Sequence, residues 1–163
     1  MQISSQVTIA SGAAFRLSSA GELIALSNPL EADENLKTIL LVDDNPGVRE
    51  VAAELLRGAG YRIVEADSAE TALAAAAKDG PIDLMIADIV MKGMRGTVLG
   101  AALSETRPSM EILYVSGYPD EYSSEVEQQE RAAFLQKPFT APALLKAIGQ
   151  LLQRAESDAV TAR

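Results

Sequence analysis

The fold is decided by one stretch, Thr38-Ile39-Leu40-Leu41-Val42-Asp43-Asp44-Asn45. Its unbroken apolar run is typical of a strand buried on both faces, as the strands of parallel sheets are. Two adjacent acids follow the run, and open parallel α/β sheets bind their ligands at the carboxyl ends of the strands. Taken alone, the acidic pair fits two interpretations: a site for a divalent cation, or a helix cap beside a solvated charge.

The composition of the chain narrows its possible chemistry. The length of 163 residues fits one domain with a sizeable core, and the net charge of −9 argues against a nucleic-acid-binding surface. Histidine and cysteine are absent, which excludes a serine–histidine triad, a thiol nucleophile and a cysteine zinc site. No apolar run approaches the ~20 residues of a membrane span, and no basic secretory signal opens the chain. We therefore expect a cytoplasmic protein.

From Thr38 onward the chain alternates between strand and helix patterns. Strands are expected over residues 38–42, 61–66, 82–87, 110–115 and 133–136. Helices are expected between them, including a polar helix over residues 120–131 and a closing helix over residues 140–153. Five strands alternating with five helices predict a parallel sheet that is covered on both faces and joined by right-handed crossovers.

Polar side chains end four of the five expected strands. They are Asp43 and Asp44, Asp88, Ser116 and Lys137. In the strand order 2-1-3-4-5, strands one and three flank the topological switch point, and these side chains meet at one rim. Three carboxylates without a histidine favour Mg²⁺, beside which a carboxylate can attack a phosphoryl group. Asp88, the lone acid at the end of the middle strand, is the best candidate nucleophile, while Lys137 and Ser116 suit the phosphoryl oxygens.

Four motifs occupy these strand ends. They are Leu41-Val42-Asp43-Asp44-Asn45, Met85-Ile86-Ala87-Asp88-Ile89-Val90-Met91, Val115-Ser116-Gly117-Tyr118 and Phe134-Leu135-Gln136-Lys137-Pro138-Phe139. In their residues and spacing, the four motifs resemble the receiver domain of two-component response regulators, and the resemblance covers residues 38–153. It implies an α/β, flavodoxin-like (βα)5 doubly wound parallel sheet with strand order 2-1-3-4-5, and a cis peptide bond between Lys137 and Pro138.

The resemblance implies a role for each polar residue at the rim. Asp88 would accept a phosphoryl group from a phosphohistidine, and Lys137 would contact that group. Mg²⁺ would be held by oxygens of four residues: Asp43, Asp44, Asp88 and Val90, the last through its backbone carbonyl. Ser116 would swing toward the phosphoryl group, and Phe134 would fill the vacated space as the aromatic switch residue.

The resemblance also implies a signalling protein and not an enzyme. Its expected partners are a histidine kinase or histidine phosphotransfer protein upstream and a target protein that contacts the face of helix four, strand five and helix five. No output domain is expected after residue 153, and the protein is expected to be a monomer or a phosphorylation-dependent dimer. In the loop after Asp88, Lys92 and Arg95 replace the Pro and the acid that are usual in the family.

Two other classes remain as alternatives. One is a pseudo-receiver, which is a protein-interaction module of this fold without phosphotransfer. The other is a Mg²⁺-dependent phosphatase of the haloacid dehalogenase type, which also uses an Asp nucleophile. That class needs Asp-x-Asp at the end of strand one, where this chain has Asn45 in place of the second acid.

The two ends of the chain differ from its centre. Residues 1–37 are expected to be a partly ordered leader, with a turn and short strand in Gly12–Leu17 and a linker in Pro29–Asn35. Ile3–Val7 together with Gly12–Leu17 resembles the last strands of the ATP-binding domain of histidine kinases, which often precedes a receiver in hybrid kinases. Residues 154–163 are expected to form a flexible tail.

Overall fold

The computed structural model describes residues 6–8, 14–17, 23–26 and 36–162, and the chain divides into two compact units, residues 1–36 and 37–163. In the first unit, an antiparallel sheet is formed by β1 (Gln6–Thr8), β2 (Ala14–Leu17) and β3 (Leu23–Leu26), in that order. The short strand expected within residues 12–17 is thus present as β2. The linker expected over residues 29–35 lies outside the described residues, as do Ile3, Ser4 and Ser5 of the kinase-like segment.

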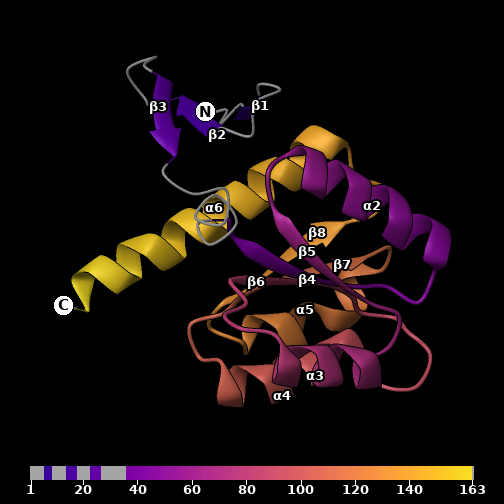
Figure 1. Ribbon diagram of the computed structural model, residues 1–163. Helices are drawn as coiled ribbons and strands as arrows, with labels where there is room; N and C mark the ends of the chain where they lie inside the picture. The colour runs from indigo at the N-terminus through magenta and orange to yellow at the C-terminus, as the bar shows by residue number, and fades with distance from the viewer. Residues whose placement is uncertain (1–5, 9–13, 18–22, 27–35, 163) are drawn as a thin grey trace. The chain divides into compact units, whose positions relative to one another are not determined.

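The second unit is a parallel sheet with helices on both faces (Figure 1). Its elements are β4 (Thr38–Val42), α2 (Pro46–Gly58), β5 (Arg62–Ala66), α3 (Ala69–Lys78), β6 (Leu84–Asp88), α4 (Gly96–Thr106), β7 (Glu111–Ser116), α5 (Pro119–Glu127), β8 (Ala132–Gln136) and α6 (Ala141–Thr161). The strand order β5-β4-β6-β7-β8 confirms the expected order 2-1-3-4-5 and the doubly wound fold. Within the described segments, no helix has both the length and the apolarity needed to cross a membrane.

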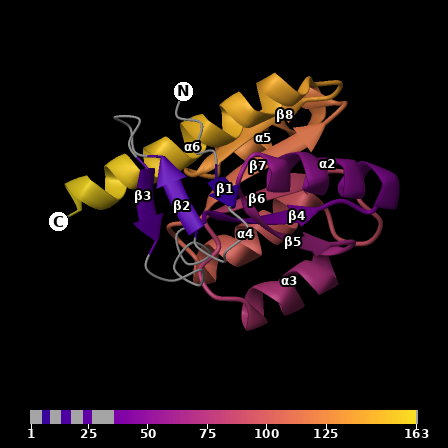
Figure 2. The same cartoon turned by 45° about the horizontal axis from the view of Figure 1, so that its top comes forward.

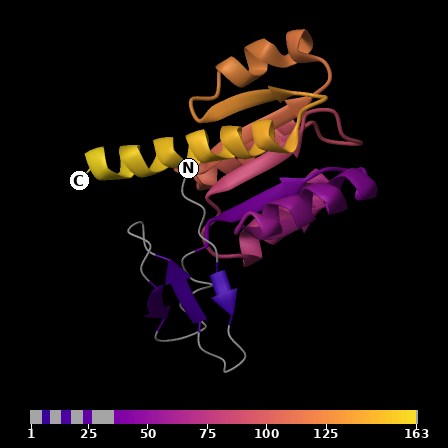
Figure 3. The ribbon, with the colours of Figure 1, turned by 90° about the horizontal axis from the view of Figure 1, so that it is seen from above.

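The two covered faces explain the unbroken apolar run of β4. Ile39 and Leu41 pack in the core layer under α2 and α6, while Leu40 and Val42 pack in the layer under α3, α4 and α5. Figures 2 and 3 show α2 and α6 together on one side of the sheet. Because successive side chains of a strand point to opposite faces, every residue of β4 is buried in one layer or the other.

Polar residues just after β4 and β5 start the helices that follow. The side chain of Asn45 accepts hydrogen bonds from the amides of Gly47 and Val48, and Pro46 occupies the first turn of α2. Ser68 and Thr71 form a reciprocal capping box at the start of α3. Since Asn45 caps α2, neither Asp43 nor Asp44 is needed for that purpose.

Two helices end at places that the sequence does not predict. The helix expected over residues 120–131 ends at Glu127, because Gln129 turns inward to bond Tyr114 and the Thr97 carbonyl. The closing helix does not end near residue 153 but continues to Thr161, so the flexible tail expected after Arg154 is helical instead. The physical reason is a set of ion pairs in which Arg154 bonds Glu111 and Asp158 bonds Arg131.

Candidate functional site

The carboxyl ends of three parallel strands bring a lysine and two carboxylates together. Lys137 follows β8, and its Nζ lies 2.7 Å from Oδ2 of Asp88 at the end of β6. The same Nζ lies 3.9 Å from Oδ2 of Asp43, directly after β4. The peptide bond between Lys137 and Pro138 is cis, as expected. Residues that are 49 positions apart along the chain thus form one polar cluster at the topological switch point between β4 and β6.

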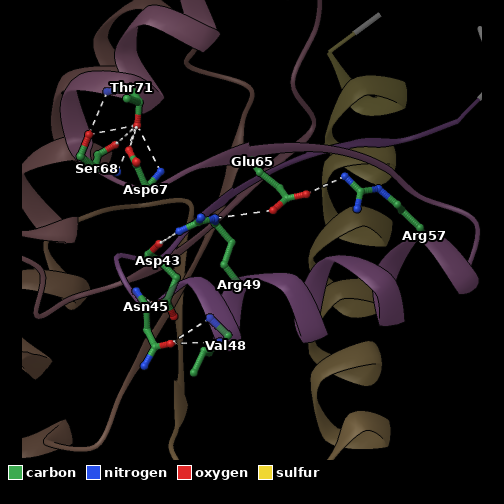
Figure 4. Close-up of polar contacts among 10 residues, drawn as sticks. Asp43, Asn45, Val48, Arg49, Arg57, Glu65, Asp67, Ser68 and Thr71 are labelled. Atoms are coloured by element: carbon green, nitrogen blue, oxygen red, sulfur yellow. Dashed lines mark hydrogen bonds and ion pairs between the residues drawn. The ribbon is translucent and has the colours of Figure 1, made fainter.

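Asp43 is held on three sides. Its amide donates to the Ala66 carbonyl on β5 (3.2 Å), its Oδ1 accepts from the Asn45 amide (2.8 Å), and its carbonyl accepts from Nη1 of Arg49 (2.7 Å). Figure 4 shows Asp43 beside Asn45 and Arg49 at the start of α2. The residue is only 5% exposed, and this burial raises the pKa of its carboxyl. The Asn45 amide and Lys137 oppose that rise, while the charges of Asp88 and Asp44 add to it.

Asp44 turns toward the loop that follows β6. Its Oδ2 accepts a hydrogen bond from the Lys92 amide at 3.2 Å, so the loop is fastened over the acidic pair. Gly93 permits the turn of this loop because its φ is +82°, in the left-handed region that favours glycine. On the near side of the loop, the Val90 amide donates to Oδ1 of Asp88 at 3.0 Å. One oxygen of Asp88 therefore faces an amide and the other an ammonium.

Ser116 and Phe134 lie next to the cluster without joining it. Ser116 is buried, and its Oγ accepts from the Tyr118 amide at 3.1 Å instead of contacting Asp88. Phe134 is half-buried on β8, where it pairs in register with Tyr114 of β7. Ser116 does not cap α5, because that helix has no side-chain cap.

The donor set fits a magnesium ion, although no three acidic side chains in the described part of the chain gather closely enough to form a metal cluster by themselves. Mg²⁺ commonly takes only one or two carboxylates and completes its shell with carbonyl and water oxygens. Asp43 and Asp88 can supply the two carboxylates. The single positive charge of Lys137 does not balance the negative charges of Asp43, Asp44 and Asp88. Burial is the main cause of the raised pKa of Asp43, and the charges of Asp88 and Asp44 add a smaller repulsion that a divalent cation would relieve.

Sequence patterns did not single out Arg49, Glu65 or the Lys92 amide. Arg49 lies six residues after Asp43, on the first turn of α2, and its side chain points back to the strand end. The spacing of Arg49 from the helix cap could have indicated this contact. A long basic side chain one helical turn after the N-cap residue can reach back to the loop before the helix.

A pH experiment tests the burial of Asp43. Because its pKa is raised above the ordinary value of 3.8, its stabilising contribution is present below that value and is lost as pH rises through the raised pKa. Asp43→Asn is therefore expected to become more stable relative to the wild type as pH rises above 3.8. The measurement is urea unfolding followed by circular dichroism, with EDTA present.

Asp67 provides a control of opposite sign. A hydrogen bond from Oγ1 of Thr71 (2.8 Å) holds its pKa below 3.8, so its contribution is present above that value and is lost as pH falls. Asp67→Asn is expected to lose stability relative to the wild type as pH rises toward 3.8, and to show no further relative change above that value, where Asp43→Asn becomes more stable. Parallel curves for the wild type and Asp43→Asn would contradict the interpretation of Asp43.

This fold and rim define a class: doubly wound parallel α/β domains with an acidic site and a lysine at the switch point. The chain belongs to the response regulator receiver domain family, whose model matches residues 39–149. The resemblance drawn from the four sequence motifs is thereby confirmed.

Three similar proteins illustrate the relationship. The sensor kinase CckA of Brucella abortus (strain 2308) is 32% identical over 119 residues, which are 72% of this chain and 13% of CckA. The response regulator receiver protein CpdR of the same organism is 28% identical over 118 residues, 72% of this chain and 98% of CpdR. A CheY-like receiver domain protein from Methanospirillum hungatei JF-1 matches with a TM-score of 0.71 and 29% identity, covering 76% of this chain and 99% of that one. The chain matches only 13% to 26% of the length of the first curated relatives.

Proposed function

We propose that this protein is a phosphoacceptor of a two-component phosphorelay and that Asp88 is the acceptor. The observation that carries this proposal is the 2.7 Å contact between Nζ of Lys137 and Oδ2 of Asp88, beside the buried carboxylate of Asp43. An ammonium in this position can stabilise the negative oxygens of a phosphoryl group on Asp88. Membership of the receiver family supports the same assignment.

The proposed donor is the phosphohistidine of a kinase or a phosphotransfer protein in the cytoplasm. A carboxylate oxygen of Asp88 attacks phosphorus, and the new O–P bond forms as the N–P bond breaks, so that the bonding electrons leave with the imidazole nitrogen. The Val90 amide orients the Asp88 carboxylate through its hydrogen bond to Oδ1. Lys137, which contacts Oδ2, moves its ammonium to the oxygens of the transferred phosphoryl group. Asp43, Asp88 and the Val90 carbonyl, with Asp44 alongside, would hold Mg²⁺, which when bound would supply positive charge to the phosphoryl oxygens.

We further propose that phosphorylation is transmitted through Ser116 and Phe134. The Ser116 hydroxyl gives up the hydrogen bond that it accepts from the Tyr118 amide and donates one to a phosphoryl oxygen instead. Phe134 then moves into the space that the Ser116 side chain leaves. Phe134 lies on β8 at the edge of the sheet, next to α5 and α6. A target protein that binds the face of α5, β8 and α6 would therefore distinguish the two states.

Acetyl phosphate tests the proposal without knowledge of the kinase. The wild-type protein is expected to gain the mass of one phosphoryl group in Mg²⁺ and to gain none in EDTA. Because the product is an acyl phosphate, hydroxylamine is expected to remove the added mass. No gain in Mg²⁺ would leave the chain as a pseudo-receiver, and steady release of phosphate from many small esters would favour the phosphatase alternative.

A further inference from the structure

Arg49 connects α2 to the strand that carries the acidic pair. Its Nη1 donates to the Asp43 carbonyl at 2.7 Å, and its Nε lies 3.5 Å from Oε2 of Glu65 on β5 (Figure 4). The Arg49 side chain is only 18% exposed. The Arg49 guanidinium is therefore partly desolvated, and it acts as a clamp between the Asp43 carbonyl and Glu65.

Glu65 holds the clamp in place. Its Oε2 faces Arg49. Its Oε1 accepts a hydrogen bond at 2.7 Å from Nη2 of Arg57, which lies nearer the carboxyl end of α2. The two arginines therefore share one carboxylate, but only Arg49 also reaches Asp43. Arg57 is half-exposed and offers a matched position for comparison.

The carbonyl that Arg49 holds belongs to the peptide that joins Asp43 to Asp44. Fixing this peptide fixes the plane from which both carboxylates project. The other restraints on Asp43 are its amide bond to Ala66 and the Asn45 amide on its Oδ1, and neither restrains the carbonyl.

We propose that Arg49 is a positioning residue for the Mg²⁺-binding acids, held in place by Glu65. This inference rests on the proposed function because it assigns Arg49 to the same acidic site. It goes beyond an attachment of α2 to the sheet, which Arg57 also provides through Glu65. Residues that orient metal ligands typically contribute about 10-fold to 100-fold to metal affinity.

Electrostatics and positioning predict opposite signs for the loss of Arg49. Removing a positive charge near three carboxylates makes the site more negative, so charge alone predicts tighter Mg²⁺ binding in Arg49→Gln. Loss of the fixed peptide predicts weaker binding. The direction of the change therefore separates the two effects.

The test is a calorimetric titration of the full-length protein with magnesium chloride. Arg49→Gln is expected to raise the Kd for Mg²⁺ about tenfold. Arg57→Gln also removes one positive charge and one of the two arginines that pair with Glu65. It is expected to leave the Kd for Mg²⁺ within about twofold of the wild type, because an exposed ion pair contributes little free energy. Arg49→Lys keeps the charge but carries all of its donors on one nitrogen, and its Kd is expected to lie between those of the wild type and Arg49→Gln.

Thermal unfolding of the same variants tests whether Arg49 has a purely structural role. Such a role would lower the stability of Arg49→Gln but leave its Kd for Mg²⁺ equal to that of Arg57→Gln. An Arg49→Gln Kd equal to that of Arg57→Gln, or below that of the wild type, would overturn the inference. Failure of the wild type to accept a phosphoryl group while it still binds Mg²⁺ would overturn the proposed function instead.

Discussion

Asp88→Asn is expected to abolish phosphoryl uptake from acetyl phosphate in the presence of Mg²⁺. The amide has nearly the shape of the carboxylate, and its oxygen can still accept from Lys137 or the Val90 amide, so the fold is retained. An amide oxygen is not a competent nucleophile toward phosphorus, and the variant also lacks one of the site's negative charges. The measurement is the intact mass of the protein after incubation, with circular dichroism to verify folding.

Asp67→Asn is the matched control for this substitution. Asp67 is another acid directly after a strand of the same sheet, β5, but it is exposed and its carboxylate bonds Thr71 instead of Lys137. This variant is expected to take up one phosphoryl group as the wild type does. A mass gain that survives Asp88→Asn would contradict the assignment.

The sequence alone predicts the sheet and the convergence at its rim because both depend on local patterns. Apolar runs of strand length alternate with helical spacing, which leaves the parallel doubly wound order as the simplest solution. Asp43, Asp88 and Lys137 each follow such a run directly, and parallel strands place their carboxyl ends at one edge. Their proximity therefore follows from register, without knowledge of any side-chain contact.

Contacts between side chains far apart in the sequence are not predictable in this way. Arg49 has the pattern of a solvated helix residue, and only the register of β4 with β5 brings Glu65 within its reach. Glu111 likewise has the pattern of a polar residue at the start of a strand, although it is fully buried. The extension of α6 to Thr161 depends on the partners of Glu111, which lie 20 and 43 residues further along the chain.

The ion cluster around Glu111 carries the second large prediction. The Glu111 carboxylate accepts from Nη1 of Arg131 at 2.7 Å and from Nε of Arg154 at 3.1 Å. Replacing both arginines by Met leaves a buried charge without a partner. Such a loss is expected to cost about 3–5 kcal/mol of unfolding free energy, a large fraction of the about 5–15 kcal/mol that holds a typical domain together. Urea unfolding at neutral pH measures it.

A third substitution separates an unpaired charge from lost packing. Adding Glu111→Leu to the double variant removes the buried carboxylate and is expected to recover most of the lost stability, because an apolar residue of similar volume needs no counter-charge. Arg62→Met is the control, since it removes only the half-exposed pair with Asp79 and is expected to cost about 0–1 kcal/mol.

The same cluster decides where α6 ends. Arg154 bonds Glu111, and Asp158, one helical turn later, bonds Arg131, so the last turns of α6 are fastened to β7 and to the start of β8. In the Arg131→Met and Arg154→Met double variant, amide hydrogen exchange is expected to accelerate over residues 154–161 more than over residues 141–152. The earlier turns remain packed through Leu144, Ile148 and Leu151. Equal protection along the whole helix would show that helical propensity alone, without these ion pairs, extends α6 beyond the receiver core.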